Sequence, residues 1–193
     1  MKSHRGSDLN ALKTAKWLAE LTGAELVAGK CSRLLVDLNR SEKNKNLFSE
    51  YSAGLPEESR QKILKKYYMP FRNQTEDIVE NSLPVLHLSV HTFTPVLNGV
   101  ARKADIGLLY DPARLSEKAI VDRLSMKLKK KGFDVRRNYP YRGKADGHTT
   151  ALRKKYPDGE YAGIEIEWNQ KLDWKAIRES VEIIAEEARR QSL

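Results

Sequence analysis

Helical and β-type segments alternate along nearly the whole 193-residue sequence. Helices are expected where apolar residues recur every three or four positions, and strands where short runs are rich in Val, Ile and Leu. The expected helices cover residues 8–21, 57–67, 76–81, 116–131 and 173–190, and the expected strands cover residues 25–28, 34–37, 85–90, 106–109, 134–137 and 163–167. This alternation predicts one α/β domain over residues 1–193, with helices packed around a mostly parallel or mixed sheet.

Several of these helix ends carry recognisable signals. Asp8 and Asp173 are expected to cap the first and last helices with their carboxylates, and Gly23 follows the first one. Pro56 suits the first turn of the helix expected at 57–67. Pro70 is expected to end this helix and to separate it from the one at 76–81. No repeat, linker or low-complexity tract divides the sequence, which agrees with a single domain.

The formal net charge of +9 is concentrated in one stretch. Residues 123–155 hold 12 Lys and Arg but only two acidic residues, a local charge of +10, so the remainder is close to neutral. Lys127 and residues 129–131 fall at the C-terminal end of a helix. Cations are favourable there because that end of the helix dipole is negative, and their side chains are expected to be solvated. The cations beyond that end are Arg136, Arg137, Arg142, Lys144 and Arg153. No nucleic-acid-reading motif accompanies them, so binding to nucleic acid is not expected.

Other features of the composition exclude further classes. The single cysteine, Cys31, excludes an internal disulfide framework and a zinc site made of cysteines alone. No run approaches ~18 consecutive apolar residues, so no membrane span is expected. Residues 1–8 lack the apolar core of a signal peptide. A cytoplasmic protein is therefore expected.

Two histidines near residue 90 have the spacing of a helical metal-binding pair. In an extended strand, however, His87 and His91 would lie about 13 Å apart. That is too far for one zinc, whose ligands each lie ~2 Å from the metal. His91, at the end of the strand, is the better candidate for a ligand, although strand-end histidines can also be structural. His87 is expected to pack or to face solvent.

Polar residues at strand ends are candidates for a binding site, because open α/β sheets bind ligands at the carboxyl ends of their strands. Glu165 and Glu167 share one face of the last expected strand. A buried carboxylate is unfavourable unless it is paired or functional, and an edge strand with a polar solvent face is the alternative. Asn39 and Arg40 follow the expected strand at 34–37, where they either form a turn or belong to a site.

Five short motifs occur in a fixed order along the chain. They are Ser-Arg-Leu-Leu-Val-Asp-Leu-Asn-Arg at 32–40, Leu-Ser-Val-His-Thr-Phe-Thr-Pro at 88–95, Asp-Ile-Gly-Leu-Leu-Tyr-Asp at 105–111, Asn-Tyr-Pro-Tyr at 138–141 and Gly-Ile-Glu-Ile at 163–166. Together they resemble the motifs of the N-formylglutamate amidohydrolase family, from about His4 to the final helix. The resemblance implies a fold similar to that of zinc carboxypeptidases, a three-layer α/β/α sandwich with a mixed, mostly parallel sheet.

The same resemblance implies hydrolysis of a small N-acylated anionic amino acid, such as N-formylglutamate, to the free amino acid and a carboxylate such as formate. Zinc is the implied cofactor, with His91 as a ligand, and it would activate water and polarise the carbonyl. Glu165 would carry protons. Asn39 and Arg40 would bind the substrate carboxylate. The planar guanidinium group of Arg40 can hold a carboxylate with two hydrogen bonds, and Arg40 is also expected to be a catalytic residue. The further candidates for substrate binding are Arg33, Arg102 and Arg142.

The sequence departs from the family pattern at its start. The family usually begins with a strand ending in a Glu-His-Gly-Gly-like motif that supplies metal ligands, whereas only three residues precede His4. A late start of the sequence is the favoured explanation. The alternatives are that His4 and Asp8 supplement His91 as metal ligands, or that this is a non-catalytic relative which binds a small anionic ligand.

The loop at residues 142–148 combines two glycines with the cations Arg142 and Lys144. Glycine provides flexibility, so this loop could close over an anionic substrate as a lid. An ordinary solvated loop is the alternative.

Overall fold

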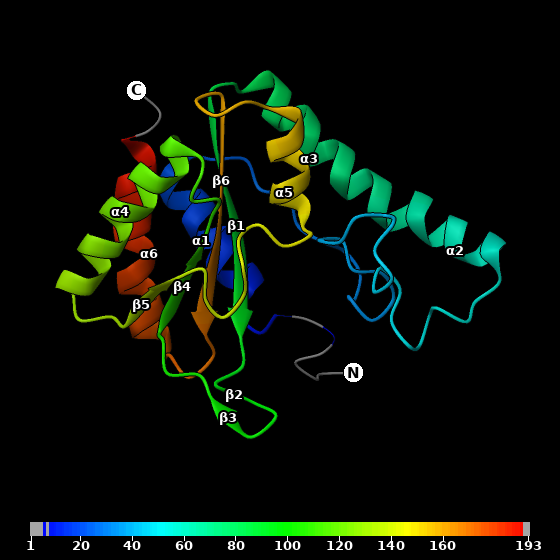
Figure 1. Ribbon diagram of the computed structural model, residues 1–193, viewed down its shortest axis with the longest axis horizontal. Coiled ribbons are helices and arrows are strands. Elements are labelled where there is room, and N and C mark those ends of the chain that lie inside the picture. The colour runs from blue at the N-terminus through cyan, green and yellow to red at the C-terminus, as the bar shows by residue number, and fades with distance from the viewer. Residues whose placement is uncertain (1–5, 7, 191–193) are drawn as a thin grey trace.

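The computed structural model describes residue 6 and residues 8–190 (Figure 1). In this part of the chain the main sheet has the strand order β1-β6-β4-β5. Its strands are β1 (Val85–Phe93), β6 (Tyr161–Asn169), β4 (Ile106–Leu109) and β5 (Val135–Arg137). β1 is parallel to β6 and β4 is parallel to β5, while β4 and β6 are antiparallel. The sheet is therefore mixed and mostly parallel, as the sequence predicts.

β6 is an inner strand, and all nine of its residues are buried. Successive side chains of a strand point to opposite faces. Ile164 and Ile166 thus enter the main core, whereas Glu165 and Glu167 point to the other face of the sheet. The edge-strand alternative for the two glutamates is wrong, because β6 pairs with β1 on one side and with β4 on the other.

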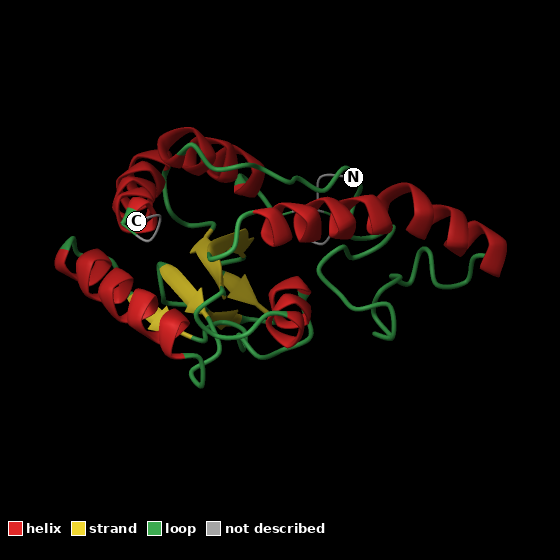
Figure 2. Cartoon of the chain, turned by 90° about the horizontal axis from the view of Figure 1, so that it is seen from above, coloured by secondary structure: helices red, strands yellow, loops and turns green. Residues whose placement is uncertain are grey.

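Three helices cover one face of the sheet (Figures 1 and 2). They are α1 (Ala11–Thr22), α4 (Leu115–Lys130) and α6 (Trp174–Arg189). Their apolar residues form the main core with alternate residues of β6 and β4. In α6, Ile177, Val181 and Ile184 recur at helical spacing and are at most 3% exposed, so one stripe of this helix is buried. Asp173 caps α6 by accepting a hydrogen bond from the backbone N–H of Ala176, as predicted.

The opposite face of the sheet is covered by α5 (His148–Lys155) and the end of α3 (Met69–Asn81). Val79, Leu152, Tyr156 and Tyr161 form a smaller core there. With helices on both faces, the architecture is the expected three-layer sandwich (Figure 2). The sequence did not predict α5.

A nearly continuous helical arm extends away from the sheet (Figure 1). It consists of α2 (Glu57–Ile63), a π-helical turn η1 (Leu64–Tyr68) and α3. The expected interruption at Pro70 is wrong, because Pro70 lies in the first turn of α3, directly after the wider turn of η1. A missing N–H is tolerated best at such a position. None of the described helices combines the length and the hydropathy needed to cross a membrane.

The strands expected at residues 25–28 and 34–37 are absent, and turns and irregular backbone occupy these positions. Val36 is nevertheless fully buried, because it packs with Leu47, Leu64 and Tyr68 beneath the helical arm. The backbone N–H of Asp37 donates to the carbonyl of Leu47 and holds this loop in place. The β-rich composition here reflects burial of a loop and not a strand of the sheet.

A short hairpin, β2 (Val96–Leu97) with β3 (Val100–Ala101), was not predicted from the sequence. Asn98 and Gly99 connect its strands and both have positive φ angles, 50° and 77°. Asn-Gly between two apolar pairs is a strong signal for such a turn, so this hairpin could have been found.

Seven of the twelve cations between residues 123 and 155 form ion pairs. Arg123 and Lys127 of α4, for example, contact Glu187 of α6 at 2.5 and 2.9 Å. Residues 129–131 are exposed at the end of α4, as expected for a solvated helix end. Most of the cations in the basic stretch are therefore paired with carboxylates, and four of these pairs, those of Arg123, Lys127, Arg153 and Lys155, join two helices.

Candidate active site

The candidate site lies on the sheet face made by β1 and β6. These strands are parallel, and their Cα register pairs His91 with Glu167 and Ser89 with Glu165. Paired residues of neighbouring parallel strands point to the same side of a sheet. The alternate residues of both strands pack into the main core. The histidine and the two glutamates therefore share the face that is covered by α5 and by the loop at residues 32–40.

His91 is joined to Asp8. His91 Nδ1 lies 2.8 Å from Asp8 Oδ2, and its Nε2 lies 3.0 Å from Ser89 Oγ, so both ring nitrogens have a partner. Burial alone would lower the pKa of His91. The hydrogen bond with Asp8 and the negative charges of Glu167, Asp8 and Glu165 outweigh that effect and raise the pKa to about 9.

Asp8 also begins a chain of ion pairs that leads into the loop at residues 32–40. Arg33 lies between two carboxylates, with Nη1 3.4 Å from Asp8 Oδ1 and Nη2 2.9 Å from Asp37 Oδ2. The expectation that Asp8 caps the first helix is wrong, because its carboxylate is engaged here. The N-cap of α1 is Asn10, which makes no capping hydrogen bond with its side chain.

Glu167 faces the His91–Asp8 pair from β6 and is only 5% exposed. Its Oε2 is buried and has no hydrogen-bond partner within the described residues. Burial raises the pKa of Glu167 to about 7. Asp8 and Glu165 act in the same direction, while His91 and Arg33 oppose it. A buried carboxylate with an open hydrogen-bonding position is suited to exchange protons with a bound molecule.

Glu165 is equally buried, but its carboxylate is occupied. Its Oε1 accepts a hydrogen bond of 2.6 Å from Thr149 Oγ1 at the start of α5. A Cβ atom at Gly147 would lie 3.6 Å from the same Oε1 and 3.3 Å from Asn39 Oδ1. Glu165 thus connects β6 with α5 and lies close to Asn39. Its expected role as proton carrier stays a prediction.

Asn39 and Arg40 lie against the same end of α5. Asn39 Oδ1 accepts a hydrogen bond of 2.7 Å from the backbone N–H of His148. Arg40 Nη1 donates to the carbonyl of Asp146 at 2.8 Å, and Arg40 Nε lies 3.8 Å from Asp37 Oδ2. The local structure is a turn and not the end of a strand. The two side chains nevertheless reach the face that holds Glu165.

The other two arginines expected to bind substrate differ in their surroundings. The guanidinium carbon of Arg102 lies 5.8 Å from the ring centre of Phe93 and 5.5 Å from that of Tyr141, so it packs beside the end of β1. Arg142 is exposed and forms no side-chain hydrogen bond or ion pair with the described part of the chain. His4, expected as a metal ligand, lies outside the described residues.

The loop at residues 142–148 is anchored at Gly143. Its N–H donates to Asn138 Oδ1 at 2.9 Å, and its carbonyl accepts from Arg153 Nη1 at 2.6 Å. A Cβ atom at position 143 would lie 2.2 Å from the backbone nitrogen of Tyr110. Glycine is therefore needed at position 143 for close packing, and closure of this loop over a substrate stays a prediction.

His87 and His148 form a buried aromatic cluster behind Glu165. His87 Nδ1 lies 2.8 Å from Tyr161 Oη, and the rings of His87 and His148 meet edge to face at 6.1 Å. Burial lowers the pKa of His87 to about 4 and that of His148 to about 2. The expectation that His87 packs is confirmed. Sequence reasoning missed His148 because α5 was not expected, although the spacing of His148, Leu152 and Tyr156 matches one helix face.

The described residues alone do not fit a catalytic zinc site. Such sites have three protein ligands. His91 and Asp8 lie together, but within residues 6 and 8–190 no group of three or more His, Cys, Asp and Glu side chains is arranged to hold a metal ion. Both nitrogens of His91 are also already engaged. A zinc site would need a further donor.

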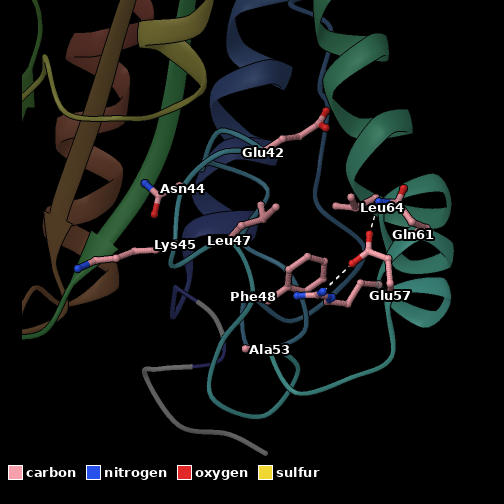
Figure 3. Close-up of a pocket in the computed structure, with 10 residues that line it drawn as sticks. Glu42, Asn44, Lys45, Leu47, Phe48, Ala53, Glu57, Gln61 and Leu64 are labelled. Atoms are coloured by element: carbon pink, nitrogen blue, oxygen red, sulfur yellow. Dashed lines mark hydrogen bonds and ion pairs between the residues drawn. The ribbon is translucent and has the colours of Figure 1, made fainter.

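A cavity of about 330 Å³ lies elsewhere, between the loop at residues 41–55 and the helical arm (Figure 3). It is lined by Glu42, Asn44, Lys45, Leu47, Phe48, Ala53, Glu57, Arg60, Gln61 and Leu64. None of the residues that the sequence predicts for the site lines it. It is therefore separate from the candidate active site.

Comparison with known proteins agrees with these observations. No curated protein matches the sequence. The crystal structure of a gene product from Agrobacterium tumefaciens is similar, with a TM-score of 0.81 and 26% identity over 99% of this chain and 79% of that chain. The crystal structure of N-formylglutamate amidohydrolase from Ralstonia eutropha JMP134 shares the fold, with a TM-score of 0.62 and 18% identity over 83% of this chain and 72% of that chain. The sequence profile of the family described as N-formylglutamate amidohydrolase matches residues 1–172. The chain therefore belongs to the N-formylglutamate amidohydrolase family.

Proposed function

We propose that this protein hydrolyses the amide bond of a small N-acylated amino acid that carries a carboxylate, with N-formylglutamate as the reference substrate. Membership of the family supports the reaction class. The observation that carries the proposal is the position of Glu167. Its Oε2 is buried, has no hydrogen-bond partner among residues 6 and 8–190, and faces the His91–Asp8 pair from the neighbouring strand.

The reaction adds water across the amide. The water oxygen bonds to the acyl carbon, the C–N bond breaks, and the leaving amine takes up a proton. Glu167 is placed to accept the proton of the water and to return one to the amine nitrogen. Glu165 is the second candidate for this role, because it lies on the same face and is similarly buried.

The substrate carboxylate would be bound at the turn that carries Asn39 and Arg40. Arg40 offers a planar fork of donors that matches a carboxylate, and Asn39 holds the turn against α5. Arg33 and Arg102 add positive charge around this position, and Arg142 is available from the exposed loop.

Zinc dependence is a separate part of the proposal. His91 and Asp8 would supply two ligands in place of the hydrogen bond that joins them, and a further donor would be needed, since the described residues hold no group of three. His4 is the candidate that the sequence offers. Zinc bound in stoichiometric amount, and lost from a His4→Ala variant, would support this ligand set.

The test is release of formate from N-formyl-L-glutamate, with and without added zinc, for the wild type and for His91→Ala and Glu167→Gln. An exposed lysine at the end of α4 provides the matched control, Lys129→Ala. Both site variants are expected to lose activity while the control retains it. Equal turnover by all four proteins would contradict the proposed site.

A second candidate function is binding of a small anion without catalysis. The specific observation in its favour is that His91 is satisfied by Asp8 and Ser89, so this pair needs no metal to be stable. Tight binding of L-glutamate without hydrolysis of N-formyl or N-acetyl amino acids, with zinc present, would favour this alternative.

A further inference from the structure

Asp146 holds Arg40 and the residue after it through two different groups. The backbone carbonyl of Asp146 accepts a hydrogen bond of 2.8 Å from Arg40 Nη1. Its side-chain Oδ2 accepts one bond of 3.0 Å from the backbone N–H of Ser41 and another of 2.6 Å from Asn44 Nδ2. One residue therefore fixes both the guanidinium group of Arg40 and the backbone that follows it. Asp146 lies outside all five sequence motifs.

The Asp146 carboxylate leaves the charge of Arg40 available to a ligand. In the part of the chain that the structure describes, these two side chains form no ion pair, and the carboxylate nearest to Arg40 is that of Asp37, 3.8 Å from Nε. Burial would raise the pKa of Asp146, but the hydrogen bonds from Ser41 and Asn44 and the charge of Arg40 outweigh it and lower this pKa. The carboxylate is therefore ionised, and an ionised acceptor forms stronger hydrogen bonds than a neutral one.

The remaining contacts of Arg40 leave one part of its guanidinium group open. Tyr68 Oη donates to the backbone carbonyl of Arg40 at 2.8 Å, which fixes the main chain at this position. Within residues 6 and 8–190, Arg40 Nη2 has no hydrogen-bond partner, and the side chain is 35% exposed. The five N–H donors of a guanidinium group share a rigid plane. Anchoring Nη1 on the carbonyl of Asp146 therefore sets the direction of the open donors.

The residues after Asp146 join this contact to the sheet face that holds Glu165. The backbone N–H of His148 donates to Asn39 Oδ1 at 2.7 Å, and Thr149 Oγ1 donates to Glu165 Oε1 at 2.6 Å. Thr149 is fully buried, so the start of α5 is firmly held against β6. The position of Asp146 is thus set relative to the sheet, and the guanidinium group of Arg40 is set relative to Asp146.

We propose that Asp146 is the positioning residue for Arg40, and that it aims the open donors of the guanidinium group at the carboxylate of the substrate. The inference rests on the proposed function for the role of Arg40 as the carboxylate-binding residue. Asp146 acts only through Arg40. Its loss is therefore expected to weaken substrate binding and to leave the chemical step unchanged.

The test is a separation of KM from kcat in Asp146→Ala. Alanine keeps the carbonyl of residue 146 but removes the side chain that fixes it. KM for N-formyl-L-glutamate is expected to rise by roughly 10- to 100-fold, because two hydrogen bonds to an ionised acceptor are lost and Arg40 is no longer oriented. The value of kcat is expected to stay within about threefold of the wild type. A fall in kcat with an unchanged KM would overturn the assignment.

Calorimetry with L-glutamate, the product of that reaction, measures binding without catalysis. Asp146→Ala is expected to weaken this binding by the same roughly 10- to 100-fold. Asp146→Asn keeps an oxygen that can accept both hydrogen bonds and is expected to stay within about fivefold of the wild type. If Asp146→Asn binds as weakly as Asp146→Ala, the charge of Asp146 and not its hydrogen bonds supports binding, and the inference is wrong.

Two further variants cover folding and nonspecific effects. Asn44→Ala removes only one of the two donors, so it tests the inference even if Asp146→Ala folds poorly. It is expected to raise KM by about 3- to 10-fold with kcat retained, and an unchanged KM would count against the inference. Lys43→Ala removes an exposed cation from the same loop and is expected to leave KM and kcat unchanged.

A double variant tests whether Asp146 acts through Arg40. Arg40→Gln alone is expected to weaken the binding of L-glutamate. Adding Asp146→Ala to Arg40→Gln is expected to weaken it by less than about twofold more, because the group that Asp146 orients is already absent. If the two substitutions instead weaken binding independently, Asp146 supports the loop in general and the inference is overturned.

The binding measurements separate this inference from the proposed function. If no N-formyl compound is hydrolysed but Asp146→Ala weakens L-glutamate binding only where Arg40 is present, the proposed function fails and the inference stands. If hydrolysis depends on Glu167 but neither KM nor L-glutamate binding depends on Asp146, the inference fails and the proposed function stands. Absence of both hydrolysis and L-glutamate binding in the wild type overturns both.

Discussion

Arg153 Nε lies 2.8 Å from Glu117 Oε1, and both side chains are almost completely buried. Arg153 also donates to the carbonyls of Gly143 and Gly163, while Glu117 accepts a hydrogen bond from the N–H of Gly163. This single pair joins α4, α5, β6 and the loop at residues 142–148. The helix α5, whose start contacts Asn39, therefore depends on charges that lie outside the candidate site.

Glu117→Ala is expected to lower the free energy of unfolding by about 3–5 kcal/mol, because it leaves Arg153 buried without a counter-charge. Arg114, whose Nε lies 3.3 Å from Glu117, loses the same partner. Urea unfolding measures the change. The exposed Glu182 provides the control, and Glu182→Ala is expected to change stability by less than about 0.5 kcal/mol. A loss below about 1 kcal/mol for Glu117→Ala would show that this pair does not hold the layers together.

Glu167→Gln is expected to reduce kcat for N-formylglutamate by about 10²- to 10⁴-fold, the range of a general acid–base group. Its melting temperature is expected to stay the same or to rise, because the variant replaces a buried carboxylate, whose Oε2 has no partner in the described part of the chain, by a neutral group of the same shape. Glu165→Gln is expected to have the smaller kinetic effect, since Thr149 already occupies its carboxylate. Steady-state kinetics with both variants measures this order, and the reverse order would assign proton transfer to Glu165.

The parts of the fold that the sequence predicts well are those in which local pattern and burial agree. β6 combines β-branched residues with burial on both faces, and α6 has both a capping aspartate and a regular apolar stripe. Residues 34–37 have a strand-like composition, but they form a loop, and Val36 of this loop is buried beneath the helical arm. Composition alone cannot distinguish these two kinds of burial.

The candidate site was only partly predictable for a similar reason. His91, Asn39 and Arg40 lie in motifs, so the resemblance could point to them. The capping pattern around Asp8 predicted a hydrogen bond to the nearby helix. The Asp8 carboxylate instead forms a hydrogen bond with His91, which lies 83 positions away in the sequence.

Gly107→Ala is expected to destabilise the protein by about 1–3 kcal/mol and to reduce activity, because β4 and the loop at residues 138–141 meet here without room for a side chain. An added Cβ would lie 1.8 Å from the carbonyl oxygen of Tyr139 and 3.3 Å from Cβ of Glu167. Thermal melts and kinetics test both effects. Gly54 has open space around it, so Gly54→Ala is the control and is expected to alter neither measurement. Wild-type stability of Gly107→Ala would show that the loop can move away.

His148 is expected to make the protein less stable as the pH falls below neutrality. Burial, followed by the charges of Arg72 and His87, lowers its pKa from 6.5 to about 2, so the folded protein keeps this side chain neutral while the unfolded chain binds a proton below pH 6.5. The stabilisation is therefore complete above pH 6.5 and is lost progressively toward acid pH, by at most about 1.4 kcal/mol per pH unit. His148→Phe tests this expectation, because phenylalanine cannot bind a proton and keeps a ring against Phe71.

The slope of the unfolding free energy between pH 6.5 and 5.0, obtained from urea titrations, is expected to be smaller in His148→Phe than in the wild type by up to about 1.4 kcal/mol per pH unit. Identical slopes in the two proteins would mean that His148 takes up a proton in the folded state as readily as in the unfolded chain.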